Sequence, residues 1–257
     1  MKQILARVIS NIEIMPGVYL IWLEASQIAL AAKPGQFVMV NCGEETFLHR
    51  PLSIHQVEDM AKEKLALLFA VKGKGTHWLS QRQEGDNLDL IGPLGNGFSL
   101  SPASSNLLLV AGGIGIAPLR FLAQEAVSRG HSVKLLLGAA DSSRLYPGHF
   151  FLPEIEIITA TEDGSTGKKG MVTGLLPGLA HWADCIFTCG PLPMYQTMVR
   201  TPVLKDRNIQ VSLEVRMGCG LGFCYGCTVK TKIGLKQVCQ DGPVFKLDEV
   251  LWDELND

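Results

Sequence analysis

Four cysteines near the end of the chain have a spacing suited to a metal cluster. Cys219, Cys224, Cys227 and Cys239 follow the pattern C-x4-C-x2-C, then eleven residues, then C. A loop that presents three thiolates, with a fourth from a neighbouring segment, is the ligand arrangement of plant-type [2Fe–2S] clusters. Glycines suit such a loop because its backbone must curl around an inorganic core, and four lie among these cysteines: Gly218, Gly220, Gly222 and Gly226. The sequence therefore predicts a [2Fe–2S] cluster held by these four thiolates.

Other interpretations of the cysteines stay open. A zinc ribbon typically has two CxxC pairs roughly 15–20 residues apart, whereas this segment has one CxxC pair and a lone Cys239. A set of reduced, buried thiols is a second alternative. Disulfides are disfavoured, because nothing in the chain indicates an oxidising compartment. A reducing compartment also tolerates the odd remainder of unpaired cysteines, which are Cys42, Cys185 and Cys189.

Length and composition exclude some function classes. A chain of 257 residues is long enough for two or three domains. The net charge of −2 and the lack of a basic tract argue against a nucleic-acid partner. The N-terminus lacks the apolar run of a signal peptide, and no window approaches the roughly 18 uncharged apolar residues of a membrane helix. We therefore expect a cytoplasmic protein with no membrane partner. Its hydrophobic share of 47% indicates a face buried against another subunit.

Residues 1–102 contain short apolar and β-branched runs between turn residues, which predicts an antiparallel barrel or sandwich. The predicted strands are 3–9, 17–24, 36–42, 52–57, 64–72 and 86–91. Two motifs in this part suit a phosphate-bearing ligand. An arginine followed by Pro-x-Ser offers a bidentate fork and a hydroxyl, and two glycines before a predicted helix over 77–81 expose N–H groups. Singly each is more often an ordinary turn, but their pairing favours a ligand site. The motif residues are Arg50, Pro51, Leu52, Ser53, Gly73, Gly75 and Thr76.

Residues 103–213 read as a nucleotide-binding sheet. The apolar run 106–111 predicts a strand buried on both faces, and a glycine loop and a helix from 119 to about Gly130 follow it. This unit is not the Rossmann fingerprint, because Pro118 stands where glycine or alanine is required. Proline in a first helical turn keeps the helix N-terminus available for an anion. Further apolar runs at 132–137, 154–159 and 185–188 predict a parallel, doubly wound sheet.

These motifs resemble the ferredoxin–NADP reductase superfamily. The resemblance rests on Arg-Pro-x-Ser with Gly-x-Gly-Thr, and on Gly-Gly-x-Gly-x-Ala-Pro with Cys-Gly-Pro-Leu-Pro-Met. It implies that FAD lies along the first motif, along Gly73, Gly75 and Thr76, and along the strand edge Leu68, Phe69 and Ala70. Leu52 replaces the tyrosine of the commoner motif, so ring stacking on the flavin is lost there. It also implies that NAD(H) binds at Gly113, Gly115, Pro118, Asp141, Cys189, Gly190, Pro191 and Met194.

The choice between NAD and NADP stays open. Asp141 follows the second strand of the predicted nucleotide sheet and would repel a 2′-phosphate, whereas the nearby Arg144 would attract one. The resemblance further implies hydride transfer at the flavin, with Cys189 and Glu214 as candidate neighbours of the reaction.

Over nearly its whole length the chain resembles the family of electron-transfer subunits of NAD-dependent dihydroorotate dehydrogenases. The similarity includes the segments 161–173, 213–217 and 238–245. It implies three domains: an antiparallel FAD-binding β-barrel over 1–102, an NAD-binding α/β domain over 103–213, and a small [2Fe–2S] domain over 214–257. Small subunits of NADH-dependent ferredoxin–NADP transhydrogenases and sulfide dehydrogenases are also similar, but they carry an aspartate where Cys219 stands. Cys219 therefore favours the dihydroorotate family.

The resemblance implies a redox relay. FAD exchanges a hydride with NAD and passes single electrons through the cluster to an FMN-containing dihydroorotate dehydrogenase catalytic subunit, in a heterotetramer with two of each chain. Dihydroorotate oxidation, a step in pyrimidine (UMP) biosynthesis, then requires the partner chain. A subunit of a transhydrogenase, sulfide dehydrogenase or hydrogenase-type complex is the alternative enzyme, and a zinc-stabilised, non-catalytic flavin-binding module is the alternative outside enzymes. We also expect Leu221, Phe223 and Tyr225 on the cysteine loop to dock on the partner.

Overall fold

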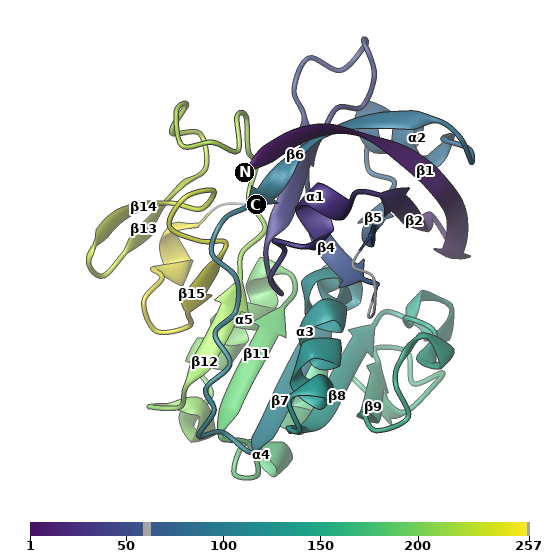
Figure 1. Cartoon of the computed structure of the whole chain (residues 1–257). Helices are drawn as coiled ribbons and strands as arrows, with labels where there is room; N and C mark the ends of the chain where they lie inside the picture. The colour runs from purple at the N-terminus through teal and green to yellow at the C-terminus, as the bar shows by residue number, and fades with distance from the viewer. Residues whose placement is uncertain (59–62, 256–257) are drawn as a thin grey trace.

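A closed antiparallel barrel forms the first part of the chain in the computed structural model, which describes residues 1–58 and 63–255 (Figure 1). Its six strands follow the order β1-β2-β5-β4-β3-β6. Closure pairs every strand on both sides and so removes exposed edges. The strands are β1 (Lys2–Met15), β2 (Val18–Glu24), β3 (Phe37–Val40), β4 (Arg50–Val57), β5 (Lys64–Ala70) and β6 (Asn87–Leu94), with short helices α1 (Ser26–Ala29) and α2 (Lys74–Ser80) between them.

The predicted strand 3–9 is too short. β1 continues to Met15 because one strand serves two neighbours: its first half pairs with β6 over Lys2–Arg7, and its second half pairs with β2 as far as Met15. Along the first half, Ala6 and Val8 are buried in the barrel whereas Leu5 is exposed. Alternate residues of a strand point to opposite faces, so this pattern places one face of β1 in the barrel core.

A seven-stranded sheet of order β10-β9-β8-β7-β11-β12-β15 follows the barrel (Figure 1). Its first six strands are parallel and β15 is antiparallel to β12. The strands are β7 (Asn106–Gly112), β8 (Ser132–Ala139), β9 (Glu156–Thr161), β10 (Lys168–Lys169), β11 (Cys185–Cys189), β12 (Ile209–Ser212) and β15 (Val244–Lys246). The helices are α3 (Ile116–Ser128), α4 (Leu176–Leu179) and α5 (Leu192–Val199), with 3-10 turns η1 (Gly113–Gly115), η2 (Ser142–Arg144), η3 (Gly148–Phe150), η4 (Val172–Leu175), η5 (Pro202–Leu204) and η6 (Trp252–Glu254).

Both faces of this sheet are covered. Along β7, Leu107 and Leu109 pack into one core with α3, whereas Leu108 and Val110 pack into a second core with α4 and α5. Burial on both faces explains why the strand is a continuous apolar run rather than an alternating one. The predicted parallel, doubly wound sheet is confirmed.

The last part of the chain closes onto this sheet. A hairpin of β13 (Thr228–Thr231) and β14 (Gly234–Gln237) stands apart, but β15 extends the central sheet beyond β12. Trp252 stacks on Tyr195 of α5 with ring centroids 4.7 Å apart. The predicted domain limits, 1–102, 103–213 and 214–257, stay predictions. No helix in the described part of the chain is long and apolar enough to cross a membrane.

Candidate cofactor cavity and cysteine loop

A cavity of about 1030 Å³ is lined by all three parts of the chain. Ligands of open α/β sheets bind beyond the carboxyl ends of the strands, and this wall includes residues that directly follow β11 and β12. The barrel contributes six residues that the sequence assigns to FAD: Pro51, Leu52, Ser53, Leu68, Phe69 and Ala70. The sheet contributes Gly190 and Pro191, which the sequence assigns to NAD. Two further predicted site residues line the wall: Glu214, a candidate neighbour of hydride transfer, and Cys227, a predicted cluster ligand.

The two predicted phosphate-binding motifs of the barrel meet beside this cavity. The guanidinium of Arg50 donates to the Leu48 carbonyl over 2.6 Å. A Cβ on Gly75 would lie 2.9 Å from Arg50 Nε, so glycine allows this side chain to lie close to the first turn of α2 without a shift. Lys72, just before α2, lines the cavity. The structure therefore brings Arg50 and Gly75 together, although their binding of FAD stays a prediction.

The helix predicted over 77–81 begins earlier. α2 starts at Lys74 because the hydroxyl of Thr76 accepts hydrogen bonds from the N–H groups of Lys72 and Gly73, at 2.9 and 3.2 Å. A side chain that bonds backbone N–H groups in this way stabilises a helix start. Thr76 thus has a capping role in this structure, beside its predicted contact with FAD.

On the sheet side, the glycine loop packs tightly against the turn after β11. A Cβ on Gly115 would lie 2.0 Å from the Cys189 carbonyl oxygen, so close backbone approach requires glycine there. Gly113, with φ of +56°, has nothing within 4 Å of a built Cβ and stays open. Met194 lies against the same loop, its sulfur 3.0 Å from a Cβ built on Gly112. The structure thus joins the two predicted nicotinamide motifs.

Six predicted NAD residues are not part of the cavity wall, namely Gly113, Gly115, Pro118, Asp141, Cys189 and Met194. Two of them, Pro118 and Asp141, have other structural roles. Pro118 is buried in the first turn of α3. Asp141 accepts a hydrogen bond from the Ser143 N–H group at 2.9 Å and pairs with Arg144 at 3.7 Å. The ion pair leaves each charge partly compensated, so it does not decide between NAD and NADP.

Cys189 and Glu214 form a close pair at the cavity. Cys189 Sγ lies 3.9 Å from Glu214 Oε1. The Glu214 side chain is exposed to the cavity, yet the walls enclose it and this desolvation raises its pKa; the Cys189 contact and the charge of Lys72 act in the opposite direction. Burial raises the pKa of the Cys189 thiol well above its usual range. A carboxyl group with a raised pKa is a suitable proton donor or acceptor.

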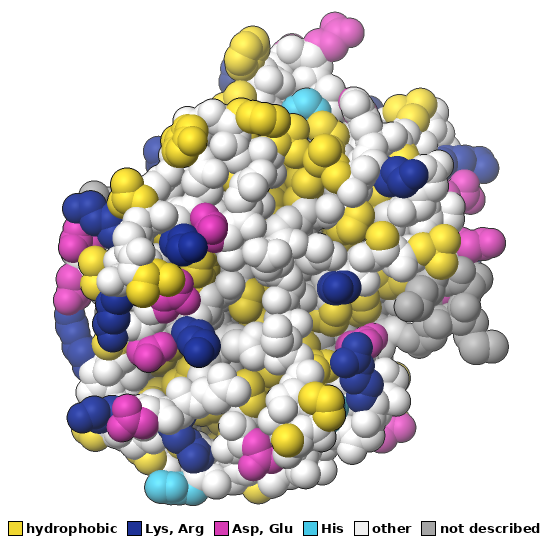
Figure 2. Space-filling view, turned by 60° about the vertical axis from the view of Figure 1, so that its left-hand side comes forward, with side chains coloured by type: hydrophobic (Ala, Val, Ile, Leu, Met, Phe, Trp, Pro, Cys, Tyr) yellow, Lys and Arg dark blue, Asp and Glu magenta, His cyan; other side chains and the backbone are white. Residues whose placement is uncertain are grey.

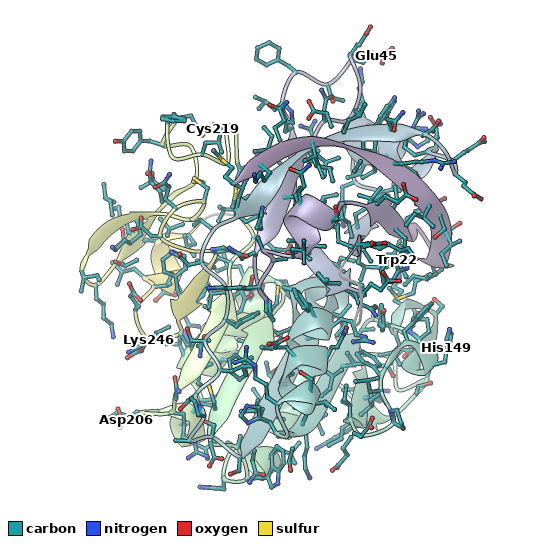
Figure 3. The ribbon with its side chains drawn as sticks, in the orientation of Figure 1. Trp22, Glu45, His149, Asp206, Cys219 and Lys246 are labelled. Atoms are coloured by element: carbon teal, nitrogen blue, oxygen red, sulfur yellow. The ribbon has the colours of Figure 1, made fainter. Side chains whose placement is uncertain are left out.

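The four cysteines of the loop come together as two pairs. Cys224 lies close enough to Cys219 to affect the pKa of its thiol, and Cys227 affects the pKa of Cys239 in the same way. Cys224 is exposed and Cys219 half-buried, whereas Cys227 and Cys239 are buried. Figure 3 shows Cys219 on its loop at the periphery of the molecule. One pair therefore lies toward the surface, and the other lies inward, where Cys227 lines the cavity.

Backbone N–H groups act on the Cys219 thiol. Burial opposes its ionisation, but the N–H groups of Leu221, Cys224 and Phe223 outweigh this effect and lower its pKa to about 7. At the inner pair, burial and the nearby Cys227 raise the pKa of Cys239 to about 12. N–H groups aimed at sulfur stabilise thiolate ligands of a cluster.

The arrangement of the four thiols fits the two irons of a [2Fe–2S] cluster. Among the described residues, no group of three or more His, Cys, Asp or Glu side chains is placed to hold one metal ion. A [2Fe–2S] cluster instead takes its four thiolates at two irons, which matches two pairs of thiols. The ligand roles of Cys219, Cys224, Cys227 and Cys239 stay a prediction that this geometry supports.

Sequence reasoning missed part of the cavity wall. Tyr195 connects the two nicotinamide-side segments, because its hydroxyl accepts from the Gly190 N–H at 2.9 Å and donates to the Ser212 carbonyl at 2.7 Å. Arg216 and Met217 also line the cavity. No ligand role is predicted for these three residues, although Arg216 and Met217 lie in the segment 213–217 that carries part of the family resemblance. Lys72, also in the wall, is the first residue of the second predicted barrel motif.

Comparisons with known proteins define the class. The chain is similar to a chain in the solved structure of an NADH-dependent reduced ferredoxin-NADP oxidoreductase, which concerns flavin-based electron bifurcation. The two chains are 32% identical with a TM-score of 0.89, and the match covers 98% of this chain and 91% of that chain. A ferredoxin NADP+ reductase from Neisseria gonorrhoeae shares the fold at 18% identity and a TM-score of 0.67, over 83% of this chain and 100% of that chain. The fold is that of the ferredoxin–NADP reductases, a class of nicotinamide-linked flavin oxidoreductases.

Sequence relatives define the family. Residues 214–251 match the iron-sulfur cluster binding domain of dihydroorotate dehydrogenase B. The "dihydroorotate dehydrogenase B (NAD(+)), electron transfer subunit" of Desulforamulus reducens is 43% identical, covering 96% of this chain and 98% of the relative, and that of Caldanaerobacter subterraneus subsp. tengcongensis is 38% identical with the same coverage. The chain belongs to this family of electron transfer subunits. It is an NAD-linked flavin and iron–sulfur oxidoreductase subunit that uses FAD, an iron–sulfur cluster and NAD(H) and works with a catalytic partner subunit.

Proposed function

We propose that this subunit relays electrons between NAD and an FMN-containing dihydroorotate dehydrogenase catalytic subunit, in a complex with two of each chain. The observation that carries the proposal is the composition of one cavity wall, which holds the predicted flavin strands, the predicted nicotinamide turn and a cluster cysteine. When bound there, FAD supplies the exchange between two-electron hydride transfer and one-electron transfer. The complex then oxidises dihydroorotate in pyrimidine biosynthesis.

Each part of the wall has a distinct task in this proposal. Arg50 and the first turn of α2 hold the FAD pyrophosphate, and Ser53 and the β5 edge hold the ring system. Glu214 and Cys189 lie at the nicotinamide turn, where the enclosed carboxyl group is placed to exchange a proton as the cofactors change charge. Cys227 extends from the cavity to the cysteine loop. Electrons thereby have a short route from the flavin site to a [2Fe–2S] cluster on the four cysteines.

The cysteine loop is the proposed exit for electrons. Phe223 and Tyr225 are 80% and 70% exposed, which is costly for aromatic side chains facing water. Figure 2 shows hydrophobic side chains on the upper part of this face of the molecule. The cysteine loop and one end of the barrel lie at the same height in Figure 1. Aromatic residues are enriched at the centres of interfaces. We therefore infer that this loop contacts the catalytic subunit.

A second candidate is a subunit of an NADH-dependent ferredoxin–NADP transhydrogenase. The 32% identity and TM-score of 0.89 to a structure of such an enzyme favour it. The candidate predicts reduction of ferredoxin by the assembled complex, whereas our proposal predicts oxidation of dihydroorotate. Cys219 favours our proposal, because the family resemblance implies an aspartate at this position in the transhydrogenase subunits.

Purification of the chain alone tests the proposed function. We expect bound FAD and two irons per chain, and NADH should reduce artificial electron acceptors without the partner. Dihydroorotate should be oxidised only after the catalytic subunit is added. Zinc without iron, or dihydroorotate turnover by the lone chain, would contradict the proposal.

A further inference from the structure

The last predicted cluster ligand, Cys239, lies in a compact turn over 237–242, the Cys239 turn. The N–H group of Asp241 donates to the Gln237 carbonyl at 2.7 Å, and the Asp241 carboxylate accepts from the Gln237 N–H group at 2.7 Å. Lys236 pairs with the same carboxylate at 3.3 Å. These local bonds fix the shape of the turn but do not determine where it lies in the molecule.

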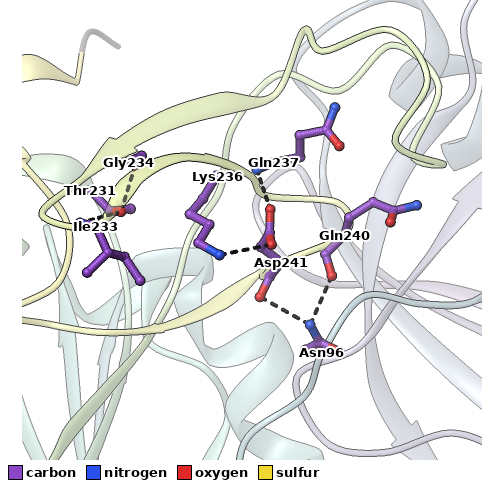
Figure 4. Close-up of polar contacts among 8 residues, drawn as sticks. All are labelled: Asn96, Thr231, Ile233, Gly234, Lys236, Gln237, Gln240 and Asp241. Carbon is purple, nitrogen blue, oxygen red and sulfur yellow. Dashed lines mark hydrogen bonds and ion pairs between the residues drawn. The ribbon is translucent and has the colours of Figure 1, made fainter.

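One residue of the barrel anchors this turn. Asn96, two residues after β6, donates through its side-chain amide to the carbonyls of Gln240 and Asp241, at 2.9 and 3.1 Å (Figure 4). Its backbone N–H group donates to the next carbonyl, that of Gly242, at 2.6 Å. Three consecutive carbonyls of the turn are thus bound by a single residue that is 144 positions from Gln240 in the sequence.

The residue before Asn96, Gly95, packs closely against the end of the Cys239 turn. Gly95 has φ of +74°, and a Cβ there would lie 2.6 Å from Pro243 and 2.8 Å from the Gly242 carbonyl oxygen. Gln36 also donates to the Gly95 carbonyl at 2.7 Å, which holds this segment to the start of β3. The barrel end and the Cys239 turn are therefore in direct backbone contact.

The opposite side of the turn contacts the loop of the other three cysteines. Gln240 donates to the Leu221 carbonyl at 2.9 Å, and Gln237 donates to the Gly222 carbonyl at 3.1 Å. A Cβ on Gly222 would lie 2.5 Å from the Gln240 amide, so glycine is required for this contact. The Cys239 turn is thus held between the cysteine loop and the flavin barrel.

We propose that Asn96 is a positioning residue that fixes the cluster-bearing turn to the flavin barrel, and thereby sets the geometry of electron transfer between the two cofactors. This inference rests on the proposed function, because it requires FAD in the barrel and Cys239 as a ligand. A planar amide supplies two N–H donors from one rigid group, which matches two adjacent carbonyls. Preorganised supports of this kind hold a reactive constellation within a narrow range of geometry.

Asn96→Ala, Asn96→Asp and the control Asn87→Ala test this role in the full, cofactor-loaded chain. Asp has the size of Asn, but its carboxylate cannot donate to carbonyls and would be repelled by them. Asn87 lies in β6 of the same barrel, and no hydrogen bond of its side chain is seen within the described residues. Three measurements apply to each variant: FAD and iron content, the rate of iron loss to a chelator, and the rates of flavin and cluster reduction after mixing with NADH.

We expect both Asn96 variants to keep FAD and to reduce the flavin at the wild-type rate. Loss of the amide bonds should speed iron loss roughly 3- to 10-fold in Asn96→Ala, and more in Asn96→Asp. Cluster reduction should be slower than in the wild type in Asn96→Ala and slowest in Asn96→Asp. Asn87→Ala should match the wild type in every measurement. Wild-type rates of iron loss and cluster reduction in both Asn96 variants would overturn the inference. A wild-type chain without iron would instead contradict the proposed function itself.

Discussion

At the scale of single residues, Arg50 and Gly75 depend on each other. The arginine side chain lies close to the first turn of α2, where a Cβ at position 75 would approach Arg50 Nε to 2.9 Å and force the side chain to shift. A guanidinium beside a helix start adds its charge to that of the N–H groups there. This combination is suited to the pyrophosphate of FAD.

Arg50→Ala should weaken FAD binding and leave the cluster in place. A hydrogen bond to a charged group contributes about 1.5–3 kcal/mol, so FAD affinity should fall roughly 10- to 150-fold. FAD titration of the apoprotein, with iron analysis in parallel, measures both effects. Arg7→Ala, which changes an exposed arginine of β1 in the same barrel, is the matched control. Full FAD occupancy in Arg50→Ala would show that Arg50 has only a structural role.

Cys224→Ala should abolish the cluster and spare the flavin. Cys224 is the exposed member of the outer thiol pair, and its removal leaves one iron with an open position for water and oxidation. The visible spectrum and the iron content should then show FAD alone. Cys185→Ala removes a buried thiol of β11 that has no proposed ligand role and should leave the cluster intact. An unchanged cluster spectrum in Cys224→Ala would exclude this residue as a ligand.

At the scale of elements, His55 joins the barrel to the sheet. Its ring, in β4, donates from Nδ1 to the Ala117 carbonyl in α3 and accepts at Nε2 from the Tyr146 hydroxyl, both at 2.9 Å. This tautomer satisfies both partners. Burial lowers the pKa of His55 to about 3, and the nearby Arg120 adds to the effect. The folded protein therefore holds this imidazole neutral.

Stability should fall as the pH drops below about 6.5. The unfolded chain binds a proton at His55 below that ordinary pKa, whereas the folded chain does not until about pH 3. The contribution of His55 is thus complete above pH 6.5 and is lost progressively between 6.5 and 3. At pH 5.5 the loss is about 1.4 kcal/mol.

Urea unfolding at pH 7.5 and 5.5 measures this dependence. His55→Gln removes the titrating group. The difference in unfolding free energy between the two pH values should therefore be smaller in this variant than in the wild type, by about 1.4 kcal/mol. His181→Gln, at an exposed histidine, should keep the wild-type difference. An equal pH dependence in His55→Gln and the wild type would contradict the role of His55.

At the scale of the whole molecule, the cavity and the cysteine loop place the two cofactor sites in series. Cys227 is part of both the cavity wall and the cysteine loop, since it lines the cavity and lies beside Cys239. Phe223 and Tyr225 lie at the outer end of this route, on the exposed side of the loop. In the proposed function, the nicotinamide therefore binds at the interior end of this route, and the partner contacts its exterior end.

Phe223→Asp should weaken assembly with the catalytic subunit while both cofactors and NADH-to-dye activity stay unchanged. A charge at the centre of an apolar contact must be desolvated on binding, which is costly. Co-purification and the dissociation constant of the complex measure the effect. Met171→Asp changes a 63% exposed hydrophobic residue next to η4 in the sheet part and should assemble normally. Equal affinity of Phe223→Asp and the wild type would exclude this loop as the contact.

The sequence by itself determined the local chemistry. The spacing of four cysteines, the two barrel motifs and the apolar strand runs depend on neighbours within a few turns of chain, so residue types alone predict them. They predicted the barrel and the doubly wound sheet. The full length of β1 was missed, because a strand shared between two partners depends on both of them.

Only the tertiary structure decided which of these segments meet. Gly115 touches the Cys189 carbonyl, and Asn96 reaches Gln240 across 144 positions. Such contacts depend on how the barrel and the sheet pack, and no local pattern records that packing. The enclosure of Glu214 by the cavity walls, which desolvates the carboxyl group and raises its pKa, has the same origin. Chemistry that resides in one segment was therefore predictable, whereas geometry between distant segments required the fold.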